Sequence, residues 1–84
     1  MTIKLAKHAK TKIGQRNIKI DDIRKVALNP DLIEPDKYDK SLTHFIGDIG
    51  GRFLRIIGRR GSKEDLLIIS AFFDRRVKDV KDKG

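Results

Sequence analysis

The longest apolar run of the chain lies at residues 65–76, with the sequence DLLIISAFFDRR. Apolar side chains stand at both odd and even positions, so both faces of an extended chain would be apolar here. A strand of this kind is typical of the interior of a sheet, where both of its faces are covered. The run ends in Asp74-Arg75-Arg76, which places two guanidinium groups at the rim of the sheet and suggests an anion site.

The first fifteen residues follow an amphipathic helical pattern. Leu5, Ala9 and Ile13 recur at four-residue steps, which places them on one stripe of a helix over residues 1–15. A brief extended start at residues 2–3 is the alternative for the first positions. Glycine near the end of this pattern, at residue 14, and Arg-Asn at residues 16–17 indicate where the helix stops.

A second helix is expected to start at Asp21 or Asp22, because either carboxylate can cap a helix and favours the positive end of its dipole. Its apolar stripe consists of Ile23, Val26 and Ala27. The Asn-Pro pair at residues 29–30 is expected to end it, since proline disfavours helical geometry in the residue before it. Residues 31–40 contain a second proline and many charges and are interpreted as a loop, with a short edge strand as the alternative.

From residue 41 onward the apolar period changes to two. Residues 41–47 and 52–60 alternate like strands, and the glycines within residues 48–51 predict a tight hairpin between them. The order of elements predicts an α+β fold with two N-terminal helices packed on a three- to four-stranded antiparallel sheet. We expect a single domain over residues 1–78 and a frayed, charged tail over residues 79–84.

The helices can cover only one face of so small a sheet. In the second strand, Leu54 and Ile56 alternate with Phe53, Arg55 and Arg59. We therefore expect Leu54 and Ile56 to face the helices, and the two arginines to line the open face alongside Phe53.

Composition narrows the class of function. The chain has 84 residues, a formal net charge of +8 and no cysteine. Residues 1–20 contain six Lys and Arg and no acid, residues 21–51 are net acidic, and residues 52–84 are net basic again. If the two ends meet in the fold, a one-sided positive field results, as is typical of proteins that bind nucleic acid. A plainly solvated basic surface is the alternative.

Other classes of function find no support in the composition. Without cysteine neither a disulfide framework nor a thiolate zinc site is possible, and two histidines make a poor metal cluster. We expect no metal and no cofactor. No segment has the length of a membrane span or the apolar core of a secretory signal, so a cytoplasmic protein without membrane contact is expected. The sequence sets no oligomeric state.

Four stretches in order carry a resemblance to a known family: KHAKTKIGQRNI, NPDLI, GDIGGRFLRII and SAFFDRRV. Together they resemble the domain-of-unknown-function 4258 family over roughly residues 3–78. That family in turn resembles the BrnT and RelE ribonuclease toxins, which set helices against a curved antiparallel sheet, in a RelE-, BrnT- or barnase-like fold, and use its concave face for RNA. The resemblance implies a metal-independent endoribonuclease, often encoded with an antitoxin.

The family's motif carries over onto particular residues. Its His-Ala pair matches His8-Ala9, and its second arginine matches Arg16. Its first arginine falls on Lys12, which keeps the charge but loses the planar fork that grips phosphate with two hydrogen bonds. Its glycine falls on an asparagine at residue 17. The terminal Asp-Arg-Arg of the family matches residues 74–76.

Cleavage of RNA without a metal needs a base for the 2′-hydroxyl proton, an acid for the leaving 5′-oxygen, and positive charge at the phosphate. We predict His8 as base or acid, with Arg16 and Arg75 stabilising the phosphate, and His44 as a second proton carrier. The residues expected to bind nucleic acid are Lys4, Lys12, His44, Arg55, Arg59 and Arg76.

Each of these residues also has a structural interpretation. His8 would fix the first helix on the sheet, His44 would flank the core, and Arg16 would bond the last carbonyls of its helix. Asp74 would form an ion pair with the arginines after it. Phe53 and Phe72, which stack on bases in the functional interpretation, would fill the core.

The leading hypothesis is a toxin-like, metal-independent endoribonuclease that binds RNA and has an acidic antitoxin protein as its partner. The alternative is a non-catalytic basic module that binds nucleic acid or an acidic partner protein. A degenerate family member kept only for protein interaction is a third possibility.

Overall fold

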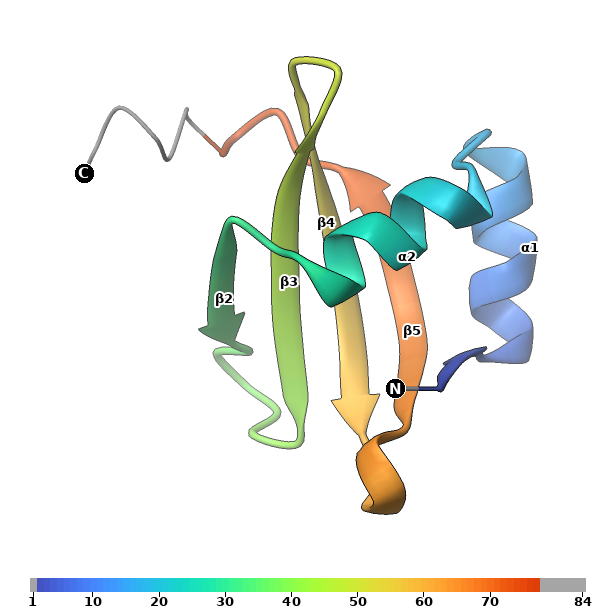
Figure 1. Ribbon diagram of the computed structural model, residues 1–84, viewed down its shortest axis with the longest axis vertical. Helices are drawn as coiled ribbons and strands as arrows, with labels where there is room; N and C mark the ends of the chain where they lie inside the picture. The colour runs from blue at the N-terminus through green and yellow to red at the C-terminus, as the bar shows by residue number, and fades with distance from the viewer. Residues whose placement is uncertain (1, 78–84) are drawn as a thin grey trace.

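Two helices cover one face of a five-stranded sheet in the computed structural model, which describes residues 2–77 (Figure 1). This arrangement confirms the predicted α+β class. The expected tail over residues 79–84 lies outside the described residues. The elements in order are β1 (Ile3–Leu5), α1 (Lys7–Gln15), α2 (Ile20–Leu28), β2 (Leu32–Pro35), β3 (Leu42–Ile49), β4 (Arg52–Arg60), the short 3₁₀ helix η1 (Ser62–Glu64) and β5 (Leu66–Phe73).

The sheet has the strand order β1-β5-β4-β3-β2. The pairs β2–β3, β3–β4 and β4–β5 are antiparallel, whereas β1 pairs with the other edge of β5 in parallel. The sheet therefore has five strands rather than the predicted three to four, because a short edge strand lies on each side of the three long strands β3, β4 and β5. Strand β5 is interior, as its apolar pattern predicts, but β4 is the middle strand. For residues 31–40 the sequence predicts a loop, with a short edge strand as the alternative, and Leu32–Pro35 within this segment form the edge strand β2.

The first helix begins at Lys7 rather than at the start of the chain. Residues 3–5 are extended because they pair with β5, where Ile3 stands opposite Leu66. The predicted helical stripe still holds from Ala9 to Ile13, which are both buried. Three residues are too few to show an apolar period, so β1 is defined only by its pairing with β5.

The second helix begins at Ile20, with Lys19 rather than an aspartate at the N-cap position. The carbonyl of Lys19 accepts hydrogen bonds from the backbone N–H groups of Asp22 and Ile23. The two aspartates lie in the first turn, where their charge still favours the positive end of the helix. The helix ends at Leu28, before the Asn-Pro pair, as predicted.

The predicted hairpin joins β3 to β4 through Gly50 and Gly51, whose φ angles are 61° and 89°. Two successive residues with positive φ are the requirement of the tight turns that match the twist of a hairpin, and glycine meets it without strain. The turn sets the register in which Phe45 stands opposite Ile56 and Gly47 opposite Leu54.

The core lies between the helices and the near face of the sheet. Its buried residues are Ala9, Ile13, Ile18, Ile23, Val26 and Ala27 from the helical half, and Phe45, Leu54, Ile56, Leu66, Ile68 and Ala71 from the sheet. Alternate residues of a strand point to opposite faces. Arg55 and Phe53 therefore line the face away from the helices, as predicted. None of the described helices is long and apolar enough to cross a membrane.

Gly58 lies at a β-bulge where close packing leaves no room for a larger side chain. The register of β4 against β5 shifts between Ile57 and Gly58, and a methyl group at Gly58 would lie 2.9 Å from a side-chain carbon of Leu66 and 3.1 Å from the backbone oxygen of Leu67. Gly58→Ala is expected to lower the free energy of unfolding by about 2 kcal/mol through overpacking, measured by urea denaturation.

Gly14 provides the matched control for this substitution. It lies in α1, and a methyl group there would meet no atom within 4 Å. Gly14→Ala is expected to raise stability by about 0.5–1 kcal/mol through helix propensity. Equal effects of the two substitutions would contradict the overpacking argument.

Candidate functional site

Polar side chains from three strands, and from the residue after β5, converge on the open face of the sheet. Glu34 of β2 stands opposite His44 of β3, and Arg55 of β4 stands opposite Phe72 of β5. Asp74 follows directly after β5, and its backbone N–H donates to the carbonyl of Phe53 in β4, which holds it beside the sheet. Side chains on one face of adjacent strands lie within reach of one another. The parity of each strand thus brings these groups together.

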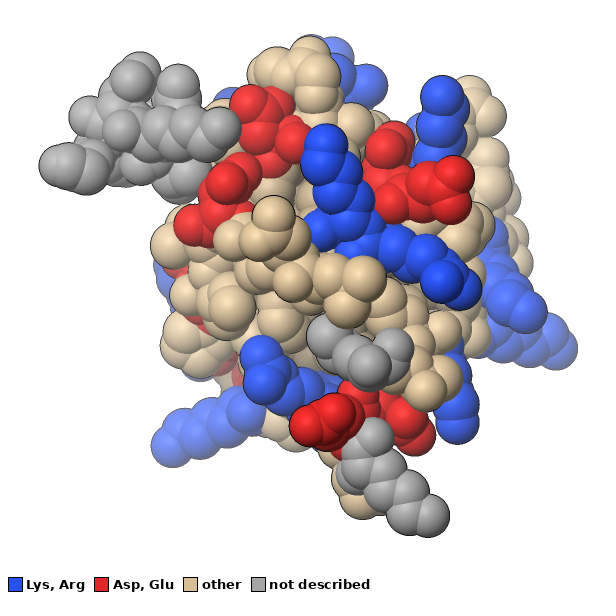
Figure 2. All heavy atoms as spheres, viewed as in Figure 1, with Lys and Arg blue, Asp and Glu red and all other residues tan. Residues whose placement is uncertain are grey.

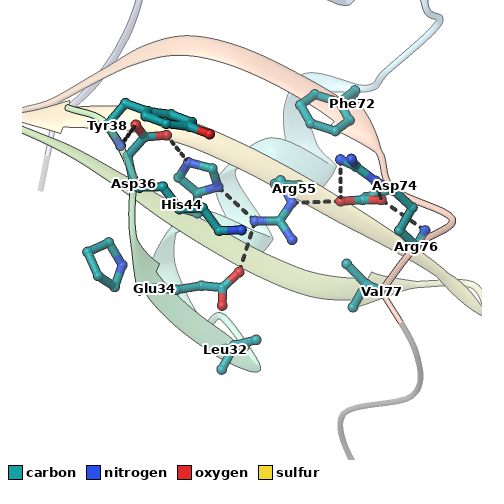
Figure 3. A pocket seen from close by; sticks show the side chains of 12 residues that line it. Leu32, Glu34, Asp36, Tyr38, His44, Arg55, Phe72, Asp74, Arg76 and Val77 are labelled. Atoms are coloured by element: carbon teal, nitrogen blue, oxygen red, sulfur yellow. Dashed lines mark hydrogen bonds and ion pairs between the residues drawn. The ribbon is translucent and has the colours of Figure 1, made fainter. Parts of the chain in front are cut away.

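Arg55 is the centre of this cluster (Figure 3). Its Nε donates to Oδ2 of Asp74 at 2.8 Å. Its Nη1 lies 3.0 Å from Oε1 of Glu34 and 2.7 Å from Nδ1 of His44. Nε2 of His44 lies 2.7 Å from Oδ1 of Asp36. The chain of contacts therefore runs from Asp36 through His44 and Arg55 to Asp74.

The contacts of His44 decide which ring nitrogen carries its proton. A guanidinium group has only donors, so Nη1 of Arg55 must donate to Nδ1 of His44. Nδ1 is then the acceptor, and the proton sits on Nε2, which donates to the carboxylate of Asp36. In this arrangement His44 is a neutral imidazole with a fixed tautomer, and its unprotonated nitrogen points at Arg55.

A local turn holds Asp36 in place. Oδ2 of Asp36 accepts hydrogen bonds from the backbone N–H groups of Tyr38 and Asp39, which leaves Oδ1 free for His44. Aspartate often makes such bonds to the backbone two or three residues further on. The pKa of Asp36 is lowered to about 2 by these hydrogen bonds: the largest effect comes from the N–H of Asp39, followed by the ring of His44 and the N–H of Tyr38. The carboxylate that orients His44 is therefore ionised at neutral pH.

Asp74 is the most buried charged group of the cluster, with 3% of its side chain exposed. Burial raises its pKa, but hydrogen bonds from the side chain and backbone of Arg76 and from Arg55 outweigh burial and lower the pKa to about 2. The Nε of Arg76 lies 3.1 Å from Oδ1 of Asp74. The predicted ion pair at the end of the last strand is therefore present, and Arg76 and Arg55 both share in it.

A cavity of about 650 Å³ opens over the cluster. It is lined by Leu32, Glu34, Pro35, Asp36, Lys37, Tyr38, His44, Arg55, Phe72, Asp74, Arg76 and Val77. The aromatic rings of Tyr38 and Phe72 lie at opposite ends, with His44 and Arg55 between them (Figure 3). The residue Tyr38 is 95% exposed, and the side chain of Arg76 is 82% exposed. The cavity thus offers an aromatic surface and a cation to an incoming ligand.

Three of the residues expected to bind nucleic acid lie in this cavity: His44, Arg55 and Arg76. His44 shares its parity with buried Ile46, but that parity belongs to the open face, so His44 does not flank the helix-covered core. Phe72 lines the cavity rather than filling that core.

The remaining basic residues of that group lie elsewhere. Arg59 donates to the hydroxyl of Ser41 and lies 3.9 Å from Asp39, near the far end of β3. Lys4 in β1 forms an exposed ion pair with Asp65 at 3.8 Å. Lys12 lies in α1 and is half-buried.

The three residues predicted to be catalytic lie on separate elements. His8 is exposed on α1, and Arg75 is exposed in the turn after β5, beside a second cavity of about 410 Å³. Arg16 follows α1, and its Nη1 donates to the carbonyl of Ala71 at 2.9 Å instead of to its own helix. Among the contacts of residues 2–77, none joins any two of these three, and their catalytic roles stay predictions.

Sequence reasoning missed Glu34, Asp36 and Tyr38, because it interpreted residues 31–40 as a loop. One signal was present: Asp36 and Asp39 flank a short polar segment directly before a strand, a pattern typical of an Asp-anchored turn. Among the described residues, no group of three or more His, Cys, Asp or Glu is arranged to hold a metal ion.

The lowered pKa of Asp74 predicts that the free energy of unfolding decreases at acidic pH. Because the folded-state pKa of about 2 lies below the ordinary value of 3.8, the stabilisation is complete above about pH 4 and is lost as the pH falls through about 2. Urea denaturation at a series of pH values is expected to show a steeper decline between pH 4 and pH 2 for the wild type than for Asp74→Asn. Parallel declines would contradict the assignment.

A family model described as "Domain of unknown function (DUF4258)" matches residues 5–73, which is most of the chain. Neither the curated proteins nor the solved structures contain a match.

Proposed function

This chain belongs to the DUF4258 family, whose description leaves its activity open, and from the geometry of the open face we propose a metal-independent endoribonuclease that acts on single-stranded RNA. The observation that carries the proposal is the cavity over β3, β4 and β5, where a histidine held by a carboxylate on one side and by a guanidinium on the other shares the lining with a second arginine and two aromatic rings. Single-stranded RNA is recognised by this combination of cations for phosphate and rings for bases.

Binding would use both ends of the cavity. The exposed ring of Tyr38 and the ring of Phe72 offer stacking surfaces for two bases. Arg76, with most of its side chain in solvent, offers the phosphate between them its free N–H donors. The phosphate also competes with Glu34 and His44 for Nη1 of Arg55.

This competition would free His44 to act as the general base. When the phosphate takes the Nη1 donor of Arg55, Nδ1 of His44 loses its hydrogen bond and can accept a proton from the ribose 2′-hydroxyl. Asp36 stabilises the imidazolium that forms, because its carboxylate already bonds Nε2. Arg55 and Arg76 stabilise the extra negative charge on the phosphorane.

The bonds and protons of the step balance. The 2′-oxygen attacks phosphorus and gives its proton to Nδ1 of His44, and the bond from phosphorus to the 5′-oxygen breaks. A solvent water protonates the leaving 5′-oxygen. The products are a 2′,3′-cyclic phosphate on one fragment and a 5′-hydroxyl on the other. His44 then returns its proton to the solvent.

The likeness to BrnT and RelE toxins belongs to the same proposal. The formal net charge of +8 favours an acidic antitoxin as the protein partner, since opposite charge speeds association. A cytoplasmic location is part of the same proposal, because an enzyme that cleaves RNA has to act where RNA is present.

A non-catalytic module is the second candidate, and one observation favours it. Three carboxylates, those of Glu34, Asp36 and Asp74, already surround Arg55 and His44, and both ring nitrogens of His44 are engaged. If RNA does not displace Arg55, the site binds but does not cleave. The same surface would then serve nucleic acid or an acidic protein.

The test is incubation of a mixed-sequence RNA with the wild-type protein in EDTA, with binding measured in parallel by fluorescence anisotropy. Fragments that end in 2′,3′-cyclic phosphate support the nuclease. Binding without fragments removes the enzyme and leaves the binding module, and absence of both removes RNA as ligand.

A further inference from the structure

A row of basic side chains leads along α1 toward the cavity. Successive residues of an α-helix are rotated by about 100°, so His8, Lys12 and Arg16 lie on one ridge at four-residue steps. The ridge flanks the stripe of Ala9 and Ile13, which faces the core. Lys7 and Lys10 lie on the other side of that stripe or away from the sheet.

Arg16 connects this ridge to the site on the open face. Its guanidinium carbon lies 6.0 Å from the centre of the Phe72 ring, and Phe72 lines the cavity. Its Nη1 donates to the carbonyl of Ala71, on the part of β5 that lies beyond its pairing with β1. This bond uses one of the five N–H donors of arginine, and the residue itself is exposed. Arg16 therefore stands where α1 and the open face meet.

The charges of the ridge have no acid to balance them on their own helix. Residues 1–20 contain no Asp or Glu, and the ion pairs among the described residues involve none of the three ridge residues. Like charges four residues apart destabilise a helix. Figure 2 shows Lys and Arg side chains projecting from the right-hand side of the molecule, over α1. Such a surface is electrostatically complementary to a polyanion.

We infer that single-stranded RNA continues from the cavity across the edge of β5 and along the ridge formed by His8, Lys12 and Arg16. This inference rests on the proposed function and extends it, because it makes the substrate a strand several phosphates long rather than a dinucleotide. From His8 to Arg16 the ridge adds about 12 Å to the binding path. Lys12 and Arg16 are then phosphate contacts, and His8 binds the strand at its far end.

The test compares an RNA of about 12 nucleotides with one of about 4 nucleotides, both uncleavable through 2′-O-methyl groups. Each phosphate contact contributes about 0.7 to the slope of log affinity against log salt for a single strand. Lys12→Gln with Arg16→Gln is expected to reduce that slope by about 1.4 for the long RNA and to leave the short RNA unchanged. The matched control, Lys7→Gln with Lys10→Gln, is expected to change neither.

Lys12→Gln alone, which removes no contact of Arg16 with the sheet, is expected to reduce the slope by about 0.7 and keeps the test valid if the double variant does not fold. If the control pair lowers the slope as much as the ridge pair, the ridge is not the path and the inference is overturned. The inference also fails if the ridge variants bind both RNAs as the wild type does, while the proposed function stands. If the wild type binds neither RNA, the proposed function fails as well.

Discussion

Replacing His44 by glutamine is expected to lower the rate of RNA cleavage by about 10²–10⁴-fold and to leave RNA affinity nearly unchanged. Glutamine retains one donor for Asp36 and one acceptor for Arg55, so the cluster keeps its hydrogen bonds. It cannot take up the 2′-hydroxyl proton. Cleavage is measured from single-turnover rates at saturating protein, and affinity from anisotropy with an uncleavable RNA.

His8→Gln is the matched control, because His8 is the other histidine of the chain and is exposed on α1, away from the cavity. At saturating protein a weaker contact at the far end of the strand does not limit the rate, so this substitution is expected to change the cleavage rate by less than about threefold. If His8→Gln stops cleavage and His44→Gln does not, the catalytic centre lies on α1, as the family motif implies, and the cavity over β3 and β4 has another role.

Replacing Arg55 by methionine is expected to lower the free energy of unfolding by about 3 kcal/mol, because it leaves the buried carboxylate of Asp74 with Arg76 as its only described cationic partner. The side chain of Arg55 is 14% exposed, whereas that of Arg76 is 82% exposed and its charge is screened by water. For a domain of this size the midpoint of thermal unfolding is expected to fall by about 15 °C. Urea denaturation and calorimetry measure the two quantities.

Two further variants separate lost charge pairing from lost packing. Arg55→Met combined with Asp74→Asn is expected to recover much of the loss, since no uncompensated charge then stays buried. Arg59→Met removes an equally long side chain from the same strand, but its contacts are exposed, so a loss of no more than about 0.5 kcal/mol is expected. Equal losses for Arg55→Met and Arg59→Met would show that burial of the ion pair contributes nothing.

Part of the candidate site could be predicted from sequence. The alternation in residues 52–60 places Arg55 on the face opposite to Leu54, and the structure confirms that this face is free of helices. Arg76 at the end of β5 was expected at the rim and lines the cavity. These predictions hold because the direction of a side chain in a strand depends only on its position along that strand.

Which histidine lies at the centre of the site could not be predicted from sequence. Motif matching favours His8, while the described contacts surround His44 with Asp36 and Arg55. The three bonds that define the cluster join residues 8, 11 and 19 positions apart. No local pattern encodes such pairs, because they depend on how far one strand is shifted against the next.

Periodicity and turn chemistry act between near neighbours in the chain, so the two helices, the three long strands, the glycine turn between β3 and β4 and the charged parity of β4 all follow from sequence. Packing between distant parts of the chain makes Ile3 to Leu5 a parallel edge strand on β5, and it directs the side chain of Arg16 to the edge of the sheet instead of to its own helix. It also brings Asp36, His44, Arg55 and Asp74 into one chain of contacts. These features require backbone and side-chain groups far apart in sequence to meet, and they form only when the packed core holds the strands in a single register.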